Sequence, residues 1–521
     1  MKIGFSRISF WGCVAAIIWT LGIYATVVRF FYGLGAATHL SDSVPWGLWI
    51  GLDILVGVGL AAGGFFITAM VYLFNLKEYQ PIVRPAILTS FLGYGLVIIT
   101  LLFDLGKPYH IWRPIVMWNH HSVMFEVGWC VLLYTLVLFF EFSPMALERL
   151  GLKKPLSLMT RSIPFLVMSG VLLSTLHQSS LGSLYLLVPD KMHPLWYSPL
   201  LPFLFFSSAV AAGLAMVIFE SYLSSRAFGR ALEFSLLVRL SRILVPVVLL
   251  YGIIRFKDLA GRGVLGAAFS GSQESLLFMA EVLFGLVLPI IVFSIPAWRN
   301  QRAGLFLGAV LVLLGFILNR LNVSITALVG SADVEYTPSW MEWAITASMA
   351  AAGVAVFRLA VKHLPVFTHQ DTQAKQVNPP LLEPGQAGAG VMAGLGGLLF
   401  LLLMALLFGL NRKQAAAKSL DGEAKPLSAS AVLRLPAAIV FEPDEASPGR
   451  VTFHHQTHVD PTRPGCVSCH ATTFRIRPIK SGQAGTVKMD SLYAGKQCGI
   501  CHNGEQAFRA DEECENCHSG R

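Results

Sequence analysis

The sequence predicts an all-α membrane protein that ends in a small, loop-rich domain, and two observations lead to this prediction. Of the 521 residues, 55% are hydrophobic and 13% are charged, against about 25% charged residues in a typical soluble domain. The eight cysteines are also unevenly placed, because six of them fall between residues 466 and 517. Cys13 and Cys130 lie singly in apolar stretches and are interpreted as buried thiols. The chain therefore divides into a membrane part and a short cysteine-rich tail.

Eleven apolar stretches, each close to the roughly 20 residues that a bilayer requires, predict eleven transmembrane helices. The first ten cover residues 8–32, 47–74, 83–103, 123–142, 160–180, 200–223, 236–254, 274–296, 303–328 and 340–361. They are joined by short connections and form a ten-helix domain at 1–365. We expect the first helix to be retained, since it is longer than the apolar part of a signal peptide.

A change of composition marks the rest of the chain. A polar, proline-rich linker is expected at 366–389, followed by the eleventh transmembrane helix at 390–411. A second linker at 412–447 then precedes the cysteine-rich domain at 448–521.

The distribution of basic residues predicts the orientation in the membrane. An N-terminus in the cytoplasm places most basic loop residues on the cytoplasmic side, as the positive-inside rule requires. These residues are Lys77, Arg84, Arg149, Lys153, Lys154, Arg161, Arg226, Arg230, Arg239, Arg242, Arg299 and Arg302. Eleven crossings then put the first linker in the cytoplasm, and the second linker and the tail in the periplasm. Because short loops hold most of the basic residues, the net charge of +9 does not indicate nucleic-acid binding.

Three motifs in the tail carry the strongest chemical signal. They are Cys466-Val467-Ser468-Cys469-His470, Cys498-Gly499-Ile500-Cys501-His502 and Cys514-Glu515-Asn516-Cys517-His518. In such a motif the two thiols bind a haem covalently and the histidine becomes an axial ligand of its iron. Zinc would not require a histidine directly after each cysteine pair. The motifs therefore predict three haem c groups, whose attachment outside the bacterial cytoplasm agrees with the predicted orientation.

Each haem iron has a sixth coordination position, for which the tail offers few ligands outside the motifs. These are His454, His455, His458 and Met489. The tail resembles the small triheme class III cytochromes, whose Phe-x-His-x-x-His opening matches Phe453–His458. The resemblance implies His455 as a ligand of the first haem and His458 as a ligand of the third. Met489 is our candidate for the middle haem, with His454 as the alternative.

Five ionisable residues of the membrane domain group toward one predicted face, the periplasmic side of the second to fifth helices. They are Asp53, Asp104, His121, Glu126 and His177. Ionisable groups in membrane spans are costly and indicate function by default. Quinol oxidation releases protons, which histidine or carboxylate groups must accept. The group therefore predicts a quinone pocket, against the alternative of hydrogen-bonded polar groups at helix ends. Haem b is not expected, because only His177 lies well inside a span.

The membrane part resembles the NrfD/polysulfide-reductase membrane-subunit family, in its ten-helix branch that includes hydrogenase cytochrome-b-like subunits. The similar segments are Leu102–Pro108, Ser174–Gly182, Asn319–Val323 and Tyr336–Glu342. The resemblance implies two four-helix bundles, from helices two to five and six to nine, flanked by two outer helices. It also implies a quinone site near the periplasmic face of the first bundle. Partners implied are an iron–sulfur subunit and other multihaem cytochrome subunits of one complex.

From these observations we expect a subunit of a respiratory quinol/quinone oxidoreductase in the bacterial inner membrane. It would exchange electrons between membrane menaquinone, or another quinone, and periplasmic redox partners through its three haems. The sequence leaves the direction of electron flow open. Two alternatives remain: a passive membrane anchor with a haem relay, or a proton-translocating module that uses Glu220, Glu281 and Glu342.

Overall fold

The structure is a computed structural model that describes two compact units, Met1–Leu420 and Asp421–Arg521. In the first unit, residues 10–41, 44, 46–331 and 336–367 are described. In the second unit, the described residues are 438–441, 447, 449–459, 488–504, 507–509, 511 and 514–519. The expected eleventh helix at 390–411, most of both linkers and the first motif, Cys466 to His470, lie outside the described residues. Each unit is considered by itself.

Ten helices of the first unit are long and apolar enough to cross a membrane, which confirms the predicted fold class for the described residues. Seven of them are continuous: α1 (Phe10–Phe31), α5 (Gln80–Asp104), α7 (Val123–Arg149), α8 (Lys153–Ser183), α9 (Leu201–Phe228), α10 (Phe234–Gly261) and α16 (Trp340–His363). The ten predicted apolar stretches all fall on the ten helices. Three helices, α7, α8 and α10, are considerably longer than predicted, because polar residues continue each helix beyond the apolar stretch.

The other three transmembrane helices each contain a wider π-helical segment. The second consists of η1 (Trp49–Val56), α3 (Gly57–Leu60) and α4 (Gly63–Tyr72). The eighth consists of α11 (Gln273–Val282), η7 (Leu283–Val287) and α12 (Leu288–Ser294). The ninth consists of α14 (Arg302–Leu321), η8 (Asn322–Thr326) and α15 (Ala327–Val329). Such segments are frequent at functional sites, and the hydropathy of the sequence does not reveal them.

Short helices complete the connections between these spans. They are α2 (Leu34–Ala37), η2 (Lys77–Tyr79), η3 (Pro108–His110), α6 (Arg113–Val116), η4 (Leu184–Leu187), η5 (Pro189–Lys191), η6 (Leu265–Phe269) and α13 (Pro296–Arg299).

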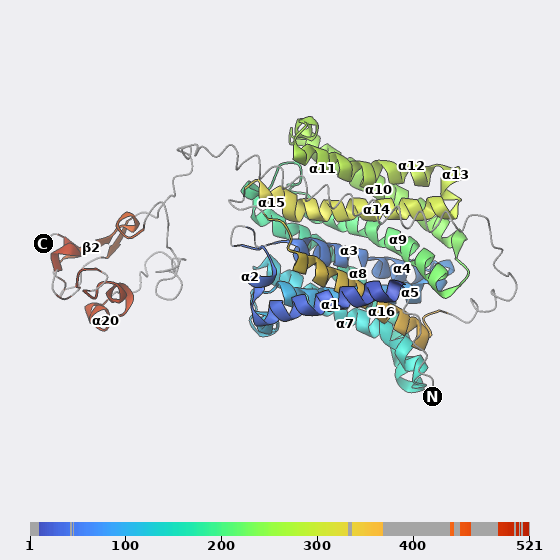
Figure 1. Cartoon of the computed structure of the whole chain (residues 1–521), viewed down its shortest axis with the longest axis horizontal. Coiled ribbons are helices and arrows are strands. Elements are labelled where there is room, and N and C mark those ends of the chain that lie inside the picture. The colour runs from blue at the N-terminus through green and yellow to red at the C-terminus, as the bar shows by residue number, and fades with distance from the viewer. Residues whose placement is uncertain are drawn as a thin grey trace. The chain divides into compact units, whose positions relative to one another are not determined.

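Helix contacts close two rings, which we call the first and the second bundle. In the first bundle, α4 contacts α5 and α8, and α7 contacts both α5 and α8. In the second, α9 contacts α10 and α14, and α12 contacts the same two helices. The rings meet where α9 packs against α4 and α8, while α1 and α16 run side by side and α16 rests on α5 (Figure 1).

Glycine pairs permit the closest helix approaches, as is usual in membranes. Between the bundles, a Cβ atom added to Gly213 would lie only 2.6 Å from the nitrogen of Gly63. Within the second bundle, a Cβ atom on Gly315 would lie 2.0 Å from Cα of Gly285. Any side chain at these positions would push the helices apart.

The described part of the second unit contains a small antiparallel sheet and single helical turns. Strands β1 (Ile439–Phe441), β2 (Arg450–Phe453) and β3 (His518–Ser519) lie in the order β1-β2-β3. Val451 pairs with His518 and Phe453 pairs with Ile439. The turns are η9 (His455–Thr457), α20 (Met489–Tyr493), η10 (Gln497–Ile500) and η11 (Cys514–Asn516). This sheet brings the last motif histidine next to the strand that precedes the other candidate ligands.

Candidate functional site

The five residues predicted to form one pocket lie in different surroundings. His177 lies inside the first bundle, and Asp53 and Asp104 lie beside α1 and α16. The carboxylate of Glu126, in the first turn of α7, accepts a hydrogen bond of 2.5 Å from the Ser180 hydroxyl of α8. His121 is exposed in the connection before α7. The structure therefore does not bring these five residues together in a single cluster of contacts.

His177 is fully buried, and neither of its ring nitrogens has a hydrogen-bond partner among the residues that the structure describes. It lies six residues before the end of α8, deeper in the helix than predicted. The ring of Tyr94 on α5 lies 5.9 Å away, and the ring of Tyr134 on α7 lies 4.7 Å from that of Tyr94. Buried polar groups are normally hydrogen-bonded, so this histidine is an exception that calls for a ligand or water.

Other unpartnered groups surround His177. The hydroxyls of Tyr94, Tyr134 and Ser174 are buried, and their mutual contacts lack hydrogen-bond geometry. Gln178, which follows His177 on α8, differs from these residues, because its side-chain amide donates a 3.1 Å hydrogen bond to the Val58 carbonyl. We call His177, Tyr94, Tyr134 and Ser174 the His177 cluster. It offers four donor or acceptor side chains to a small molecule in the centre of the first bundle.

Asp53 and Asp104 belong to a second group, which includes Arg29 of α1 and Glu342 of α16. The three carboxyl groups lie within electrostatic range of one another. Asp53 accepts a 2.8 Å bond from Thr346, whereas Oδ1 of Asp104 is buried without a partner. The buried guanidinium of Arg29 donates to the carbonyls of Phe103 and Leu105, on both sides of Asp104. The sequence reasoning missed Arg29, although a charge inside the first span signalled it.

Glu342 is held by the loop that precedes its own helix. Its carboxylate accepts the backbone N–H of Ser339 at 3.0 Å and the hydroxyl of Tyr336, forming a capping box at the start of α16. Burial and the neighbouring Glu342 raise the pKa of Tyr336, so its hydroxyl keeps the proton that it donates. Glu342 therefore has a structural role that accounts for its burial.

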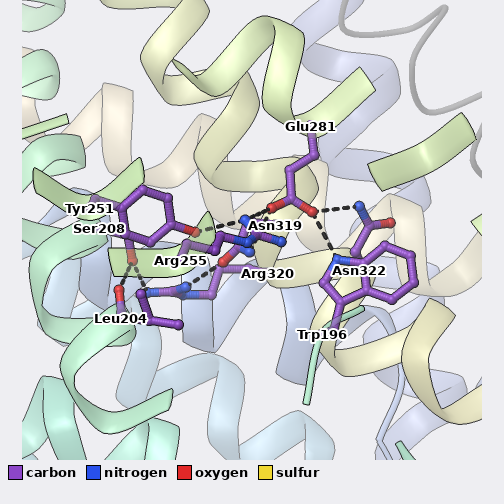
Figure 2. A network of polar contacts seen from close by, with 9 residues as sticks. All are labelled: Trp196, Leu204, Ser208, Tyr251, Arg255, Glu281, Asn319, Arg320 and Asn322. Atoms are coloured by element: carbon purple, nitrogen blue, oxygen red, sulfur yellow. Dashed lines mark hydrogen bonds and ion pairs between the residues drawn. The ribbon is translucent and has the colours of Figure 1, made fainter. Parts of the chain in front are cut away.

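Glu281 lies in a polar network at the second bundle, in the half nearer the Leu195–Ser198 connection (Figure 2). One carboxylate oxygen accepts from Asn319 at 2.8 Å and from Arg255; the other accepts from Trp196 at 2.9 Å and Asn322 at 3.0 Å. Four donors thus satisfy the carboxylate. The sequence singled out Glu281 and missed Arg255 and Arg320, although Arg320 lies inside an apolar span and Arg255 directly follows one.

Arg320 is the second buried cation of this network. It is 1% exposed and donates to the side chains of Asn319 and Ser208 and to the Phe205 carbonyl, at 2.7 to 3.1 Å. Its guanidinium also lies over the ring of Phe205, 3.7 Å from the centroid. All these partners are neutral.

Glu220 differs from Glu281 and Glu342, the other two glutamates that a proton-translocating module would use. Its Oε1 atom is buried and has no hydrogen-bond partner. It lines a cavity of about 10 Å³ together with Gly63, Thr89 and Ser90, between α4, α5 and α9. A second cavity, of about 20 Å³, lies at the Arg255 end of the second bundle. None of the five predicted pocket residues lines either cavity.

In the second unit, three candidate ligand histidines are oriented by their Nδ1 atoms. His518 Nδ1 lies 2.8 Å from the Gly449 carbonyl, and His502 Nδ1 lies 3.2 Å from that of Phe508. His458 Nδ1 lies 3.1 Å from the His454 carbonyl. A metal-binding histidine usually donates its second ring N–H in this way. These residues therefore fit a haem, with Nε2 left for iron.

The rings of His458 and His502 also make an edge contact, with their centroids 6.1 Å apart. The spacing favours His458 with the middle motif, whereas the resemblance implied the third. Met489 begins α20, His454 is exposed, and His455 contacts the Phe453 ring edge-on at 5.0 Å.

These features define a class of protein: a multi-pass helical membrane subunit with an unpartnered polar cluster in one bundle and a c-type haem domain at its C-terminal end. The family model described as polysulphide reductase, NrfD matches residues 36–332, more than half of the chain. The model of cytochrome c7 and related cytochrome c matches residues 451–519. The chain belongs to the NrfD family of integral membrane subunits and carries a cytochrome c7 domain, which confirms both resemblances.

Individual relatives agree with this assignment. The probable Ni/Fe-hydrogenase 2 b-type cytochrome subunit of Escherichia coli (strain K12) is 35% identical, over 65% of this chain and 88% of its own length. The menaquinone reductase integral membrane subunit of Nitratidesulfovibrio vulgaris is 28% identical, over 70% and 93%. The Hdr-like menaquinol oxidoreductase integral membrane subunit of Archaeoglobus fulgidus is 24% identical, over 67% and 91%. The protein is therefore a multi-pass inner-membrane subunit of an oxidoreductase in electron transport.

Proposed function

We propose that this protein is the quinone-reactive subunit of a respiratory complex and exchanges electrons between a menaquinone-type pool and periplasmic redox partners. One observation carries the proposal: fully buried His177, with both ring nitrogens unpartnered, in the centre of the first bundle. A quinone presents two oxygen atoms that need hydrogen-bond partners, and the His177 cluster supplies them. The relatives named as a menaquinone reductase subunit and a menaquinol oxidoreductase subunit support the choice of quinone.

Oxidation of a quinol releases two electrons and two protons, so bases must stand near its oxygens. In this proposal His177 accepts one proton, and Glu126, held by Ser180, lies at the end of the same bundle. Asp53 lies within electrostatic range of Asp104, whose nearby cation is Arg29. Asp104 has an oxygen atom without a partner among the described residues, and this atom would receive a proton. His121, exposed before α7, would pass protons to water. The same groups would deliver protons if the quinone is reduced instead.

Three haem c groups are proposed in the tail, bound through Cys466 and Cys469, Cys498 and Cys501, and Cys514 and Cys517. When bound, they supply one-electron redox centres. His470, His502 and His518 would be proximal ligands. His455 remains the proposed partner for the first haem, and the ring spacing supports His458 for the middle one. Met489 or His454 is then left for the third.

The proposed setting is a complex that also contains an iron–sulfur subunit and further multihaem cytochromes. The sequence has no cysteines beyond the haem motifs except Cys13 and Cys130, so an iron–sulfur centre would belong to a partner. We propose a cytoplasmic N-terminus and a periplasmic haem domain, with a linker and an eleventh helix between the two units.

The test is quinol-dependent haem reduction by the purified protein, followed by its absorbance. His177→Ala should slow the reduction roughly 100-fold, in the range of a positioned acid–base group, while the thermal unfolding temperature changes little. Leu172→Ala, on the lipid-facing side of the same helix, is the matched control and should reduce at the wild-type rate. Equal rates of haem reduction in the wild type and in His177→Ala would refute the proposed quinone pocket. Fewer than three c-type haems, or any b-type haem, would refute the proposed cofactor content.

A second candidate function is proton translocation, and one of the three glutamates named for it in the sequence supports it. Glu220 keeps a buried, unpartnered oxygen next to a cavity between the two bundles. Its replacement by Gln should then leave quinol-dependent haem reduction intact and abolish proton movement across vesicle membranes. Glu281 and Glu342 are occupied by hydrogen bonds, and their geometry gives this function no support.

A further inference from the structure

The network around Glu281 carries one more positive charge than negative charge. Arg255, Arg320 and Glu281 are 5%, 1% and 2% exposed, so water screens none of them well. Glu281 forms an ion pair with Arg255. Arg320 is held only by neutral acceptors and aromatic rings. A buried charge without a counter-ion is strongly unfavourable, so the excess calls for an anion.

Arg255 has hydrogen-bond donors to spare. Its Nη1 atom donates to Tyr251 and Glu281, whereas its Nε and Nη2 atoms have no acceptor within the described part of the protein. The Tyr251 hydroxyl accepts from Arg255, and its own proton has no acceptor among the described residues. In Figure 2, both side chains reach the network from α10.

These two side chains line the cavity of about 20 Å³. That volume is about what one water-sized particle requires. Asn319 and Trp196 line the cavity as well. So do Asp258 and Arg262, whose 2.8 Å ion pair keeps the Asp258 carboxylate neutralised. The cavity therefore has room for a single small ion and spare donors, and it borders a network with surplus positive charge, although Arg320 itself does not line it.

We propose that this cavity binds a small inorganic anion of the size of chloride, held by the Arg255 guanidinium and the Tyr251 hydroxyl. The anion neutralises the surplus charge of the network and stabilises the second bundle. This site is separate from the His177 cluster and does not depend on the proposed quinone reaction. Chloride and bromide are close to the size of a water molecule, whereas gluconate is much larger.

The experiment uses the purified full-length protein in detergent, with chloride or gluconate at equal ionic strength. Chloride should raise the unfolding temperature along a saturable curve, because a ligand that binds the folded state stabilises it. Bromide should act in the same way, and gluconate should not. Tyr251→Phe should raise the half-saturating chloride concentration roughly threefold to tenfold, the effect of one lost hydrogen bond.

Tyr222→Phe is the matched control, since Tyr222 stacks on Phe306 at 4.4 Å away from this network. It should keep the wild-type chloride curve. Identical unfolding temperatures in chloride and gluconate would mean that the cavity holds water only, and would overturn the proposal. An unchanged half-saturating concentration in Tyr251→Phe would also overturn it, by placing the ion elsewhere. Line broadening of the chloride nuclear resonance, lost on addition of bromide, gives a readout independent of stability.

Discussion

The His177 cluster in the first bundle and the Glu281 network in the second bundle differ in how their buried side chains are paired. The second bundle buries charges, and its carboxylate, Glu281, accepts four hydrogen bonds. The first bundle buries the neutral His177 cluster, whose polar atoms have no partners. Paired charges bind helices together, whereas unpartnered neutral groups are available to a ligand. The Glu281 network is thus suited to hold helices together, and the His177 cluster is suited to the proposed binding of a quinone.

The largest expected effect on the free energy of unfolding concerns the Glu281 network. Glu281→Ala should lower the free energy of unfolding by about 3–5 kcal/mol, because it leaves Arg255 buried without its counter-charge. Equilibrium unfolding in mixed detergent measures this loss. The double variant Glu281→Ala/Arg255→Met should recover part of it, since no unpaired charge of that pair remains. If Glu281→Ala were as stable as the wild type, the Glu281 network would not stabilise the second bundle, and its contrast with the His177 cluster would not hold.

A smaller loss is expected where the network loses one hydrogen bond. Tyr251→Phe should reduce the free energy of unfolding by about 1.5–3 kcal/mol, as for a bond to a charged group. The hydroxyl accepts from Arg255 at 2.8 Å, and the ring otherwise stays the same size. The same unfolding assay applies, carried out in chloride-free buffer to exclude any ion effect. No loss would mean that Arg255 finds another acceptor.

The smallest effect is expected from the same substitution in the first bundle. Tyr134→Phe removes a buried hydroxyl that makes no hydrogen bond, so the free energy of unfolding should change by less than about 1 kcal/mol or rise slightly. Quinol-dependent haem reduction should respond more than stability does. A loss as large as that of Tyr251→Phe would show that the hydroxyl is bonded after all and would weaken the ligand argument.

Hydropathy was sufficient to predict the ten membrane helices, because a bilayer demands long apolar segments whatever their packing. It could not predict the π-helical segments in the second, eighth and ninth spans, since these depend on helix contacts rather than composition. The predicted ends of α7 and α8 were too short, because polar residues such as Arg149 and Lys153 continue the helix outside the apolar region.

The candidate site was predicted less completely than the fold. His177 was singled out correctly as a buried ionisable residue, but Asp53 and Asp104 were expected beside it. They face α1 and α16 instead, and the partners Arg29 and Thr346 come from those helices. The spacing of residues along one transmembrane helix cannot show which neighbouring helix covers each of its faces. In the tail, the motif spacing predicted the proximal histidines, whereas the contact between the rings of His458 and His502 depends on the folded structure.

The contact between α1 and α16 has a consequence for biosynthesis. Asp53 and Thr346 are 293 residues apart, and Ser348 donates to the Ile18 carbonyl across 330 residues. At about 5–20 residues per second, translation takes roughly 15–60 s to supply the partner of Asp53. During that interval the polar groups of α1 and η1 face lipid, the translocation machinery or each other. The tenth helix therefore completes these contacts, and a polypeptide that ends before residue 340 lacks the hydrogen-bond partners of Asp53 and of the Ile18 carbonyl.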